Sequence, residues 1–149
     1  MIHTDQIGSP NRLRELIREL ERKLGILQET QTSCCSVTLA QCHALVEIGR
    51  AGKISLNELS DKLDIENSSM SRTVNKLVTS NLASRDIDPN DRRYVTISLT
   101  ESGLEQFHRV ETDMNTYFHG IYMAIPDNKQ NQVMESIQIL LDAISKCQK

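Results

Sequence analysis

Residues 82–103, which read LASRDIDPNDRRYVTISLTESG, decide the fold of this 149-residue chain. Apolar and polar side chains alternate over residues 82–87 and again over residues 94–99, where β-branched and aromatic types dominate. Such alternation is typical of β-strands with one buried face. The residues between them, 88–93, combine Pro, Asn and Asp, which favour turns, with two arginines. We therefore predict a β-hairpin with a basic tip.

Two short helices are predicted before this hairpin. Ser55 is expected to cap the first, which ends at a break over residues 64–67. Ser68 or Ser69 is expected to cap the second, which stops near Asn81. Apolar side chains recur at three- and four-residue steps along both, namely Leu56, Leu59, Leu63, Met70, Val74, Leu77 and Val78. Two capped helices joined by a short turn form a helix-turn-helix.

Two more helices are predicted upstream. Apolar residues at helical spacing predict the first over residues 11–29, and the Thr38–Gln41 spacing is that of a capping box that opens the second. Gly49 and Gly52 are expected to end that second helix. A polar loop is expected between the two.

Two long helices are predicted downstream, separated by a break and a new cap at Pro126-Asp127. The predicted fold is mainly α with a small β-hairpin, in the order α-α-α-α-β-β-α-α. It has a winged helix-turn-helix core over residues 38–100, flanked by dimerisation helices within residues 9–30 and 101–147.

Composition narrows the class of protein. An apolar fraction of 38% is too high for a disordered chain. No apolar run approaches membrane-spanning length, and no hydrophobic signal segment is seen, so a cytoplasmic protein is expected. The net charge of −3 gives no global attraction for nucleic acid, so any DNA contact must come from a local basic surface.

The second helix of the pair offers such a surface. Residues 67–81 include Arg72 and Lys76 and no acidic residue. Short polar side chains accompany them, which suit base edges and phosphates in a major groove: Ser68, Ser69, Ser71 and Asn75. Arg92 and Arg93 at the hairpin tip are suited to the negative potential of the adjacent minor groove. The alternative is that these polar faces are only solvated.

One extended pattern runs through the predicted core: Leu56-x-x-Leu59-Ser60-x-x-Leu63, Ser69-x-Ser71-Arg72-x-Val74-x-x-Leu77-Val78, Leu82, Arg85, Asp88-Pro89-x-Asp91-Arg92-Arg93 and Val95-x-Ile97-x-Leu99-Thr100-x-x-Gly103. In this pattern the sequence resembles the MarR family of bacterial transcriptional regulators. The resemblance extends over nearly the whole chain as a single MarR-like domain, residues 1–149.

This resemblance implies a homodimer that binds a pseudo-palindromic, double-stranded DNA operator and represses nearby genes until an effector releases it. It implies major-groove contacts by Ser68, Ser69, Ser71, Arg72, Asn75 and Lys76, and a minor-groove contact by Arg92 or Arg93. Asp91 is expected to hold one of these arginines by a salt bridge. The apolar stripes of the terminal helices support the dimer independently, because a small winged core cannot cover them.

Cysteines suggest how an effector could act. Cys34 and Cys35 fall in the predicted polar loop, and Cys42 lies one turn inside the next helix. Three converging thiolates would suit As(III), Sb(III) or Cu(I), and His43 could complete a zinc set. Oxidation is a third possibility. The alternatives are that Cys42 is a core residue and that the effector is a small organic anion. No cofactor is expected beyond such an effector.

Two other functions compete with DNA binding. A cysteine-dependent enzyme would need a base beside the thiol, for which His43 is the nearby candidate. No phosphate-binding glycine loop or nucleophile elbow accompanies it, so we expect no enzyme. A winged helix that binds protein is the other alternative, against which the basic helix and tip argue.

Overall fold

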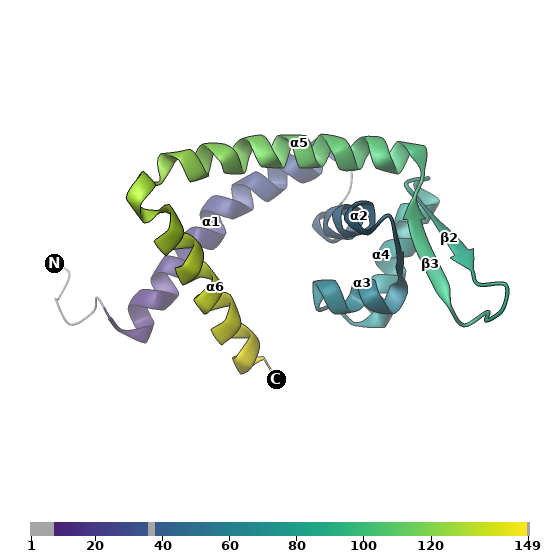
Figure 1. Cartoon of the computed structure of the whole chain (residues 1–149), viewed down its shortest axis with the longest axis horizontal. Helices are drawn as coiled ribbons and strands as arrows, with labels where there is room; N and C mark the ends of the chain where they lie inside the picture. Colours follow the sequence, from purple (N-terminus) through teal and green to yellow (C-terminus); the bar gives the residue numbers. More distant parts are fainter. Residues whose placement is uncertain (1–7, 36–37, 149) are drawn as a thin grey trace. The chain divides into compact units, whose positions relative to one another are not determined.

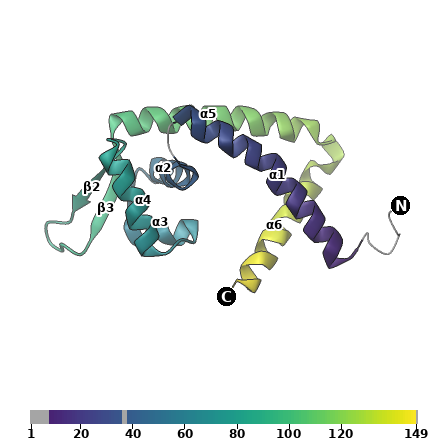
Figure 2. The same cartoon turned by 180° about the vertical axis from the view of Figure 1, so that it is seen from behind.

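The computed structural model describes residues 8–35 and 38–148, with the backbone alone for residues 26–35 (Figures 1 and 2). The protein is mainly α-helical with one small antiparallel sheet, as predicted. Contacts divide the chain after His108 into two compact units. Among the described residues, none of the helices has the length and hydropathy needed to cross a membrane.

The first helix, α1 (Pro10–Cys35), is longer than the predicted 11–29. Ser9 caps it, because its hydroxyl accepts the Arg12 backbone N–H at 3.3 Å. The polar residues that follow were predicted to form a loop, and that prediction is wrong. They contain neither proline nor glycine, so nothing in the sequence forces the helix to stop. Cys34 and Cys35 therefore belong to the last turn of α1.

The second helix, α2 (Leu39–Ala51), begins at the predicted capping box. The Gln41 backbone N–H donates to Thr38 Oγ1 at 3.2 Å, and the Thr38 N–H donates to Gln41 Oε1 at 3.4 Å. Gly52 ends the helix with φ 77°, a conformation that glycine adopts without steric cost. Helix start and helix end are thus both set locally.

The predicted helix pair consists of α3 (Leu56–Leu63) and α4 (Asn67–Thr79). Ser55 caps α3 as expected, since its hydroxyl accepts the third backbone N–H at 3.1 Å. The cap predicted for α4 is wrong. No side chain caps α4, and both Ser68 and Ser69 lie inside its first turn. The turn after α3 is shorter than the sequence break suggested, so α4 starts early enough to leave both serines available for another role.

Three strands form the sheet, in the order β1-β3-β2. The predicted hairpin is β2 (Ala83–Ile87) and β3 (Val95–Leu99), paired antiparallel with Arg85 opposite Ile97. The strand β1 (Lys53–Ser55) was not predicted, because three residues are too few to show a period. It pairs with the other edge of β3. The sheet thereby joins the hairpin to the start of α3.

The core of the first unit lies between α2, α3, α4 and the sheet. Its largest fully buried side chains come from all four: Leu45, Ile48, Leu59, Met70, Val74, Leu77, Ile97 and Cys42. Fully burying a Leu, Ile, Val or Met side chain contributes about 1.5–3 kcal/mol. This core therefore fixes α4 and the base of the hairpin as one body.

Two glycines allow α5 (Glu101–Ala124) to approach this core closely. Gly49 was predicted to end α2, but it lies inside the helix, where a Cβ would overlap the ring of Phe107. Gly103 lies against the backbone carbonyl of Leu82, which a Cβ would also overlap. Close packing therefore requires glycine at both positions, and Gly49 is not a helix stop.

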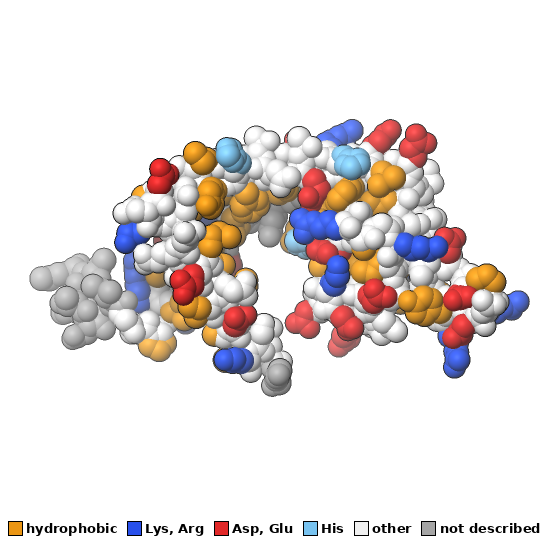
Figure 3. Space-filling model, in the orientation of Figure 1, with side chains coloured by type: hydrophobic (Ala, Val, Ile, Leu, Met, Phe, Trp, Pro, Cys, Tyr) orange, Lys and Arg blue, Asp and Glu red, His pale blue; other side chains and the backbone are white. Residues whose placement is uncertain are grey.

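The second unit contains the rest of α5 from Arg109, a 3₁₀ turn η2 (Asp127–Lys129) and α6 (Gln130–Cys147). The break predicted at Pro126 is present, but the cap predicted at Asp127 is wrong: α6 begins at Gln130, after the 3₁₀ turn, and has no side-chain cap. Many large apolar side chains of this unit are exposed, including Tyr117, Phe118, Ile121, Ile137, Leu141 and Ile144. Each of these side chains keeps between 39% and 52% of its surface exposed. Figure 3 shows apolar side chains of this unit in orange on the visible surface.

Candidate nucleic-acid interface

The exposed face of α4 carries most of the predicted DNA-contact residues. Met70, Val74 and Leu77 are fully buried on one side of the helix. The remaining side is polar: Ser68, Arg72, Asn75 and Lys76 are exposed, and Ser69 and Ser71 are half-buried. The four exposed ones share one surface, because positions 68, 72, 75 and 76 recur at three- and four-residue steps. A rigid helix with this surface is suited to a major groove.

The turn before α4 fixes its start. Asp64 ends α3 in the left-handed conformation, with φ 53°. Across the turn, Asn67 Nδ2 donates to Asn57 Oδ1 on α3 at 3.0 Å. The two asparagines were not among the predicted site residues. Their pairing is a tertiary contact that spacing alone does not reveal.

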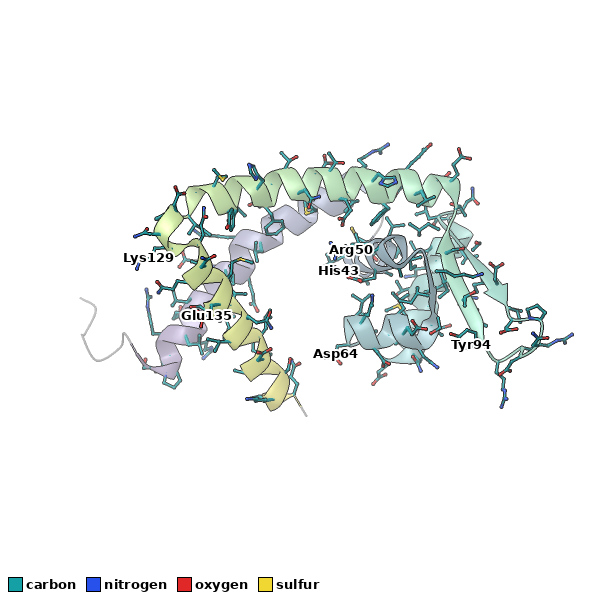
Figure 4. The ribbon with its side chains drawn as sticks, in the orientation of Figure 1. His43, Arg50, Asp64, Tyr94, Lys129 and Glu135 are labelled. Carbon is teal, nitrogen blue, oxygen red and sulfur yellow. The ribbon has the colours of Figure 1, made fainter. Side chains whose placement is uncertain are left out.

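The tip of the hairpin, residues 88–94, is held by its own hydrogen bonds. The Asp88 N–H donates to the Tyr94 carbonyl at 2.9 Å, and the Asp88 carboxylate accepts the Asn90 N–H at 2.8 Å. Tyr94 projects from the hairpin where the tip rejoins β3 (Figure 4). The tip is therefore an ordered turn that presents its arginines in a defined direction.

Asp91 forms the salt bridge that the resemblance implied, and its partner is Arg93. Its Oδ1 accepts the Arg93 backbone N–H at 3.1 Å and the Arg93 Nε–H at 3.2 Å. The Arg93 side chain is 92% exposed, so most of its donors face solvent. Arg92 beside it is exposed as well, and basic side chains mark the outer end of the hairpin in blue in Figure 3.

Ion pairing separates the basic residues of the winged core into two groups. Arg50, Lys53, Lys62 and Arg93 each have an acidic partner. Among the described residues, four others have none: Arg72, Lys76, Arg85 and Arg92. All four lie on α4, β2 or the hairpin tip. Arginines and lysines without acidic partners, grouped in this way, are what a phosphate backbone attracts.

Arg85 is a residue of this surface that the sequence interpretation did not assign to the site. It lies on β2, and its Nη2 donates to the Ser71 carbonyl of α4 at 3.4 Å. The resemblance included Arg85 in the family pattern without giving it a role. The signal in the sequence that could have assigned Arg85 to the site was its position just before the hairpin tip.

The predicted cysteine cluster is only partly described. Cys34 and Cys35 lie at the end of α1, and their side chains are outside the described residues. Cys42 is a fully buried core residue with 2% exposure, whereas His43 is exposed on α2 (Figure 4). The structure therefore does not bring Cys42 and His43 together. Within the described part of the chain, no group of three His, Cys, Asp or Glu side chains is arranged to hold a metal.

The class that these elements define is the winged helix-turn-helix: a helix pair with an exposed polar second helix, followed by a hairpin with a basic tip. Residues 37–95 match the model of the MarR family. This match confirms, over the winged helix, the resemblance seen in the sequence.

Relatives in sequence are bacterial regulators. The HTH-type transcriptional regulator YhbI of Bacillus subtilis is 27% identical over 120 residues, which cover 80% of this chain and 77% of that protein. The HTH-type transcriptional repressor MdtR of the same organism is 28% identical over 98 residues, covering 66% of this chain and 61% of that protein.

Solved structures share the fold at lower identity. FabT of Streptococcus pneumoniae in complex with DNA aligns with a TM-score of 0.85 and 15% identity, over 93% of this chain and 99% of that one. A mutant MarR from E. coli complexed with operator DNA aligns with a TM-score of 0.72 and 23% identity, over 89% and 93% of the two chains.

Proposed function

We propose that this chain is a sequence-specific, DNA-binding transcriptional regulator that acts as a homodimeric repressor. The observation that carries the proposal is the grouping of basic side chains without acidic partners on α4, β2 and the hairpin tip, while other basic residues of the core are paired with acids. The names of the curated relatives support a regulator, and one of them is a repressor. Structures of the same fold in DNA complexes support the mode of binding.

In this mode α4 enters the major groove. Arg72 and Lys76 reach phosphates or guanine edges, and Asn75 and the serines Ser68, Ser69 and Ser71 supply short hydrogen-bonding groups. Arg93 or Arg92 enters the adjacent minor groove, where narrow A·T-rich tracts attract arginine. Asp91 limits the conformations of Arg93 before it binds, which reduces the entropy lost on binding.

The homodimer is proposed from uncovered apolar surface. Leu13, Leu16 and Leu20 on α1 are each about half exposed, and the second unit exposes a larger apolar set. A two-fold interface of the terminal helices would bury both sets. The two copies of α4 would then contact half-sites about 10 bp apart, one turn of DNA.

For the effector, we propose a thiol-reactive species, such as arsenite or an oxidant, that acts at Cys34 and Cys35. Two adjacent thiols at the end of α1, directly before the winged core, support this proposal. Burial of Cys42 favours its role as a core residue. A small organic ligand is the second candidate. Cys42 is buried and His43 is exposed, which speaks against a thiol–base pair formed by these two residues.

The DNA-binding proposal is tested by fluorescence anisotropy. The wild-type protein first selects binding duplexes from a random-sequence pool, and a labelled selected duplex is then titrated with variants. Arg72→Ala should weaken binding by about tenfold or more, the cost of one good base or phosphate contact. Lys129→Ala, which removes the same charge from the second unit, should bind as the wild type does. Equal affinity for both variants would contradict the proposed docking.

The effector proposal is tested by arsenite titration of the bound complex. Release near one equivalent per subunit is expected for the wild type, and Cys34→Ser combined with Cys35→Ser should abolish it. Full release from that double variant would show that these thiols are not the sensor.

A further inference from the structure

The two strands of the hairpin are attached to the core differently: β3 pairs with β1 over residues 96–98 and its Ile97 is fully buried, whereas β2 is buried only at its first residue. The Leu82 N–H donates to the Leu77 carbonyl of α4 at 2.9 Å, and Ala83 is 3% exposed. Beyond Ala83, every residue of β2 is exposed. In the three-stranded sheet β2 is an edge strand, so its direction relative to α4 depends on β3 and on any contact that its own side chains make with α4.

Arg85 supplies such a contact. It lies on the same face of β2 as Ala83, because side chains alternate along a strand. Its Nη2 donates to the backbone carbonyl of Ser71, in the second turn of α4. Among the described hydrogen bonds and ion pairs, no other side chain of β2 reaches α4. The acceptor is a backbone atom, so the bond depends on the position of the helix itself.

We propose that Arg85 is a positioning residue that fixes the direction of the hairpin relative to α4. This inference rests on the proposed function, in which α4 and the hairpin tip contact neighbouring grooves of one DNA site. Two linked contacts reinforce each other only when their geometry allows both to form at once. A guanidinium is suited to this role, because its planar set of donors holds a carbonyl with less loss of freedom than a lysine ammonium.

Arg85 also lacks an acidic partner among the described residues, so a direct phosphate contact is the competing role. The two roles differ in coupling. A positioning residue acts through the hairpin tip, so its removal should matter little once the tip can no longer contact DNA. A phosphate contact contributes independently, and its loss should add to the loss of the tip contact.

A double-mutant cycle with Arg85→Gln and Arg93→Gln separates these roles on the selected duplex. In the wild-type background, Arg85→Gln should weaken binding by about tenfold, within the range of coupled neighbours. In the Arg93→Gln background it should weaken binding by less than about twofold. The slope of log K against log salt should be the same for the wild type and for Arg85→Gln, because a positioning residue makes no phosphate contact that the substitution could remove.

Two results would overturn the inference and make Arg85 a phosphate ligand. One is that the losses of the two single variants add up in the double variant. The other is that the slope of log K against log salt is smaller in magnitude for Arg85→Gln, by about the contribution of one phosphate contact. Unchanged affinity of Arg85→Gln would overturn it too. Thermal unfolding checks folding, and Arg85→Met, which keeps the aliphatic stem, replaces Arg85→Gln in the cycle if that variant does not fold. If the wild type selects no duplex, the proposed function itself fails, which is a different outcome from an additive cycle.

Discussion

One oxygen of the Asp91 carboxylate accepts two hydrogen bonds from Arg93, from the backbone N–H at 3.1 Å and from Nε–H at 3.2 Å. The arrangement places an acid beside the surface that is proposed to approach phosphates. Its repulsion of DNA opposes binding, whereas its restraint of Arg93 favours binding. We expect the restraint to have the larger effect, because the carboxylate is already occupied by the arginine that it holds.

Asp91→Asn should therefore weaken binding of the selected duplex by about threefold to tenfold, because Arg93 would have to lose side-chain freedom on binding. Asp86→Asn is the matched control, since it removes an acid from the same hairpin that is paired with Lys53. Anisotropy titrations of both variants give the comparison. Tighter binding by Asp91→Asn would show that repulsion dominates and that Arg93 needs no restraint.

Gly49→Ala should destabilise the protein by about 1–3 kcal/mol, because the new methyl group overlaps the Phe107 ring in a close-packed core. Gly25→Ala is the control. Gly25 is also helical but has no atom within 4 Å of the added Cβ, so this change should be neutral or stabilising by up to about 1 kcal/mol. Urea unfolding measures both, and equal stabilities would contradict close packing at Gly49.

Gly103→Ala should be more harmful than Gly49→Ala, since the added Cβ meets the backbone carbonyl of Leu82 and not a side chain that can rotate. A cost at or above about 3 kcal/mol is expected. Leu82 precedes β2 directly, so the folded fraction should also bind DNA more weakly. A variant as stable as the wild type would show that α5 does not need this close approach.

Thr38→Ala should cost about 0.5–2 kcal/mol, because it removes the capping box of α2. Ser68→Ala should change stability by less than about 0.5 kcal/mol, because Ser68 is exposed and does not cap α4. The same serine variant should weaken DNA binding. Thermal unfolding measures the stabilities and anisotropy measures DNA binding. A stability loss for Ser68→Ala comparable to that of Thr38→Ala would show that Ser68 caps α4 after all.

Cys147 should react with iodoacetamide within the native protein, whereas Cys42 should react only on unfolding, because the first is exposed and the second is buried. Pulsed labelling followed by peptide mass spectrometry distinguishes them. Labelling of Cys42 at the rate of Cys147 would return Cys42 to the set of candidate sensor thiols.

Local patterns predicted the hairpin, the helix pair and the capping box, because each depends on residues close in sequence. The alternation over residues 94–99 and the Thr38–Gln41 spacing are local signals of this kind. The strand β1 was missed since it exists only by pairing with β3, which lies far along the chain. Such pairing leaves no trace in a three-residue stretch.

The misread role of Gly49 and the role that the sequence did not give to Arg85 also have tertiary causes. Gly49 looked like a helix stop, but its role is to admit the Phe107 ring from a distant helix. The bond from Arg85 to Ser71 joins two elements through a backbone carbonyl, which no side-chain pattern encodes. The surface of α4, by contrast, was predicted from the sequence, because helical spacing alone separates its buried and exposed residues.

Binding of the wild-type protein to a selected duplex and to a scrambled duplex of the same composition tests the central claim most directly. We predict that the selected duplex contains two half-sites about 10 bp apart and binds at least about a thousandfold more tightly than the scrambled one at physiological salt. Equal affinity for the two duplexes would contradict the claim that α4 and the hairpin tip read DNA sequence.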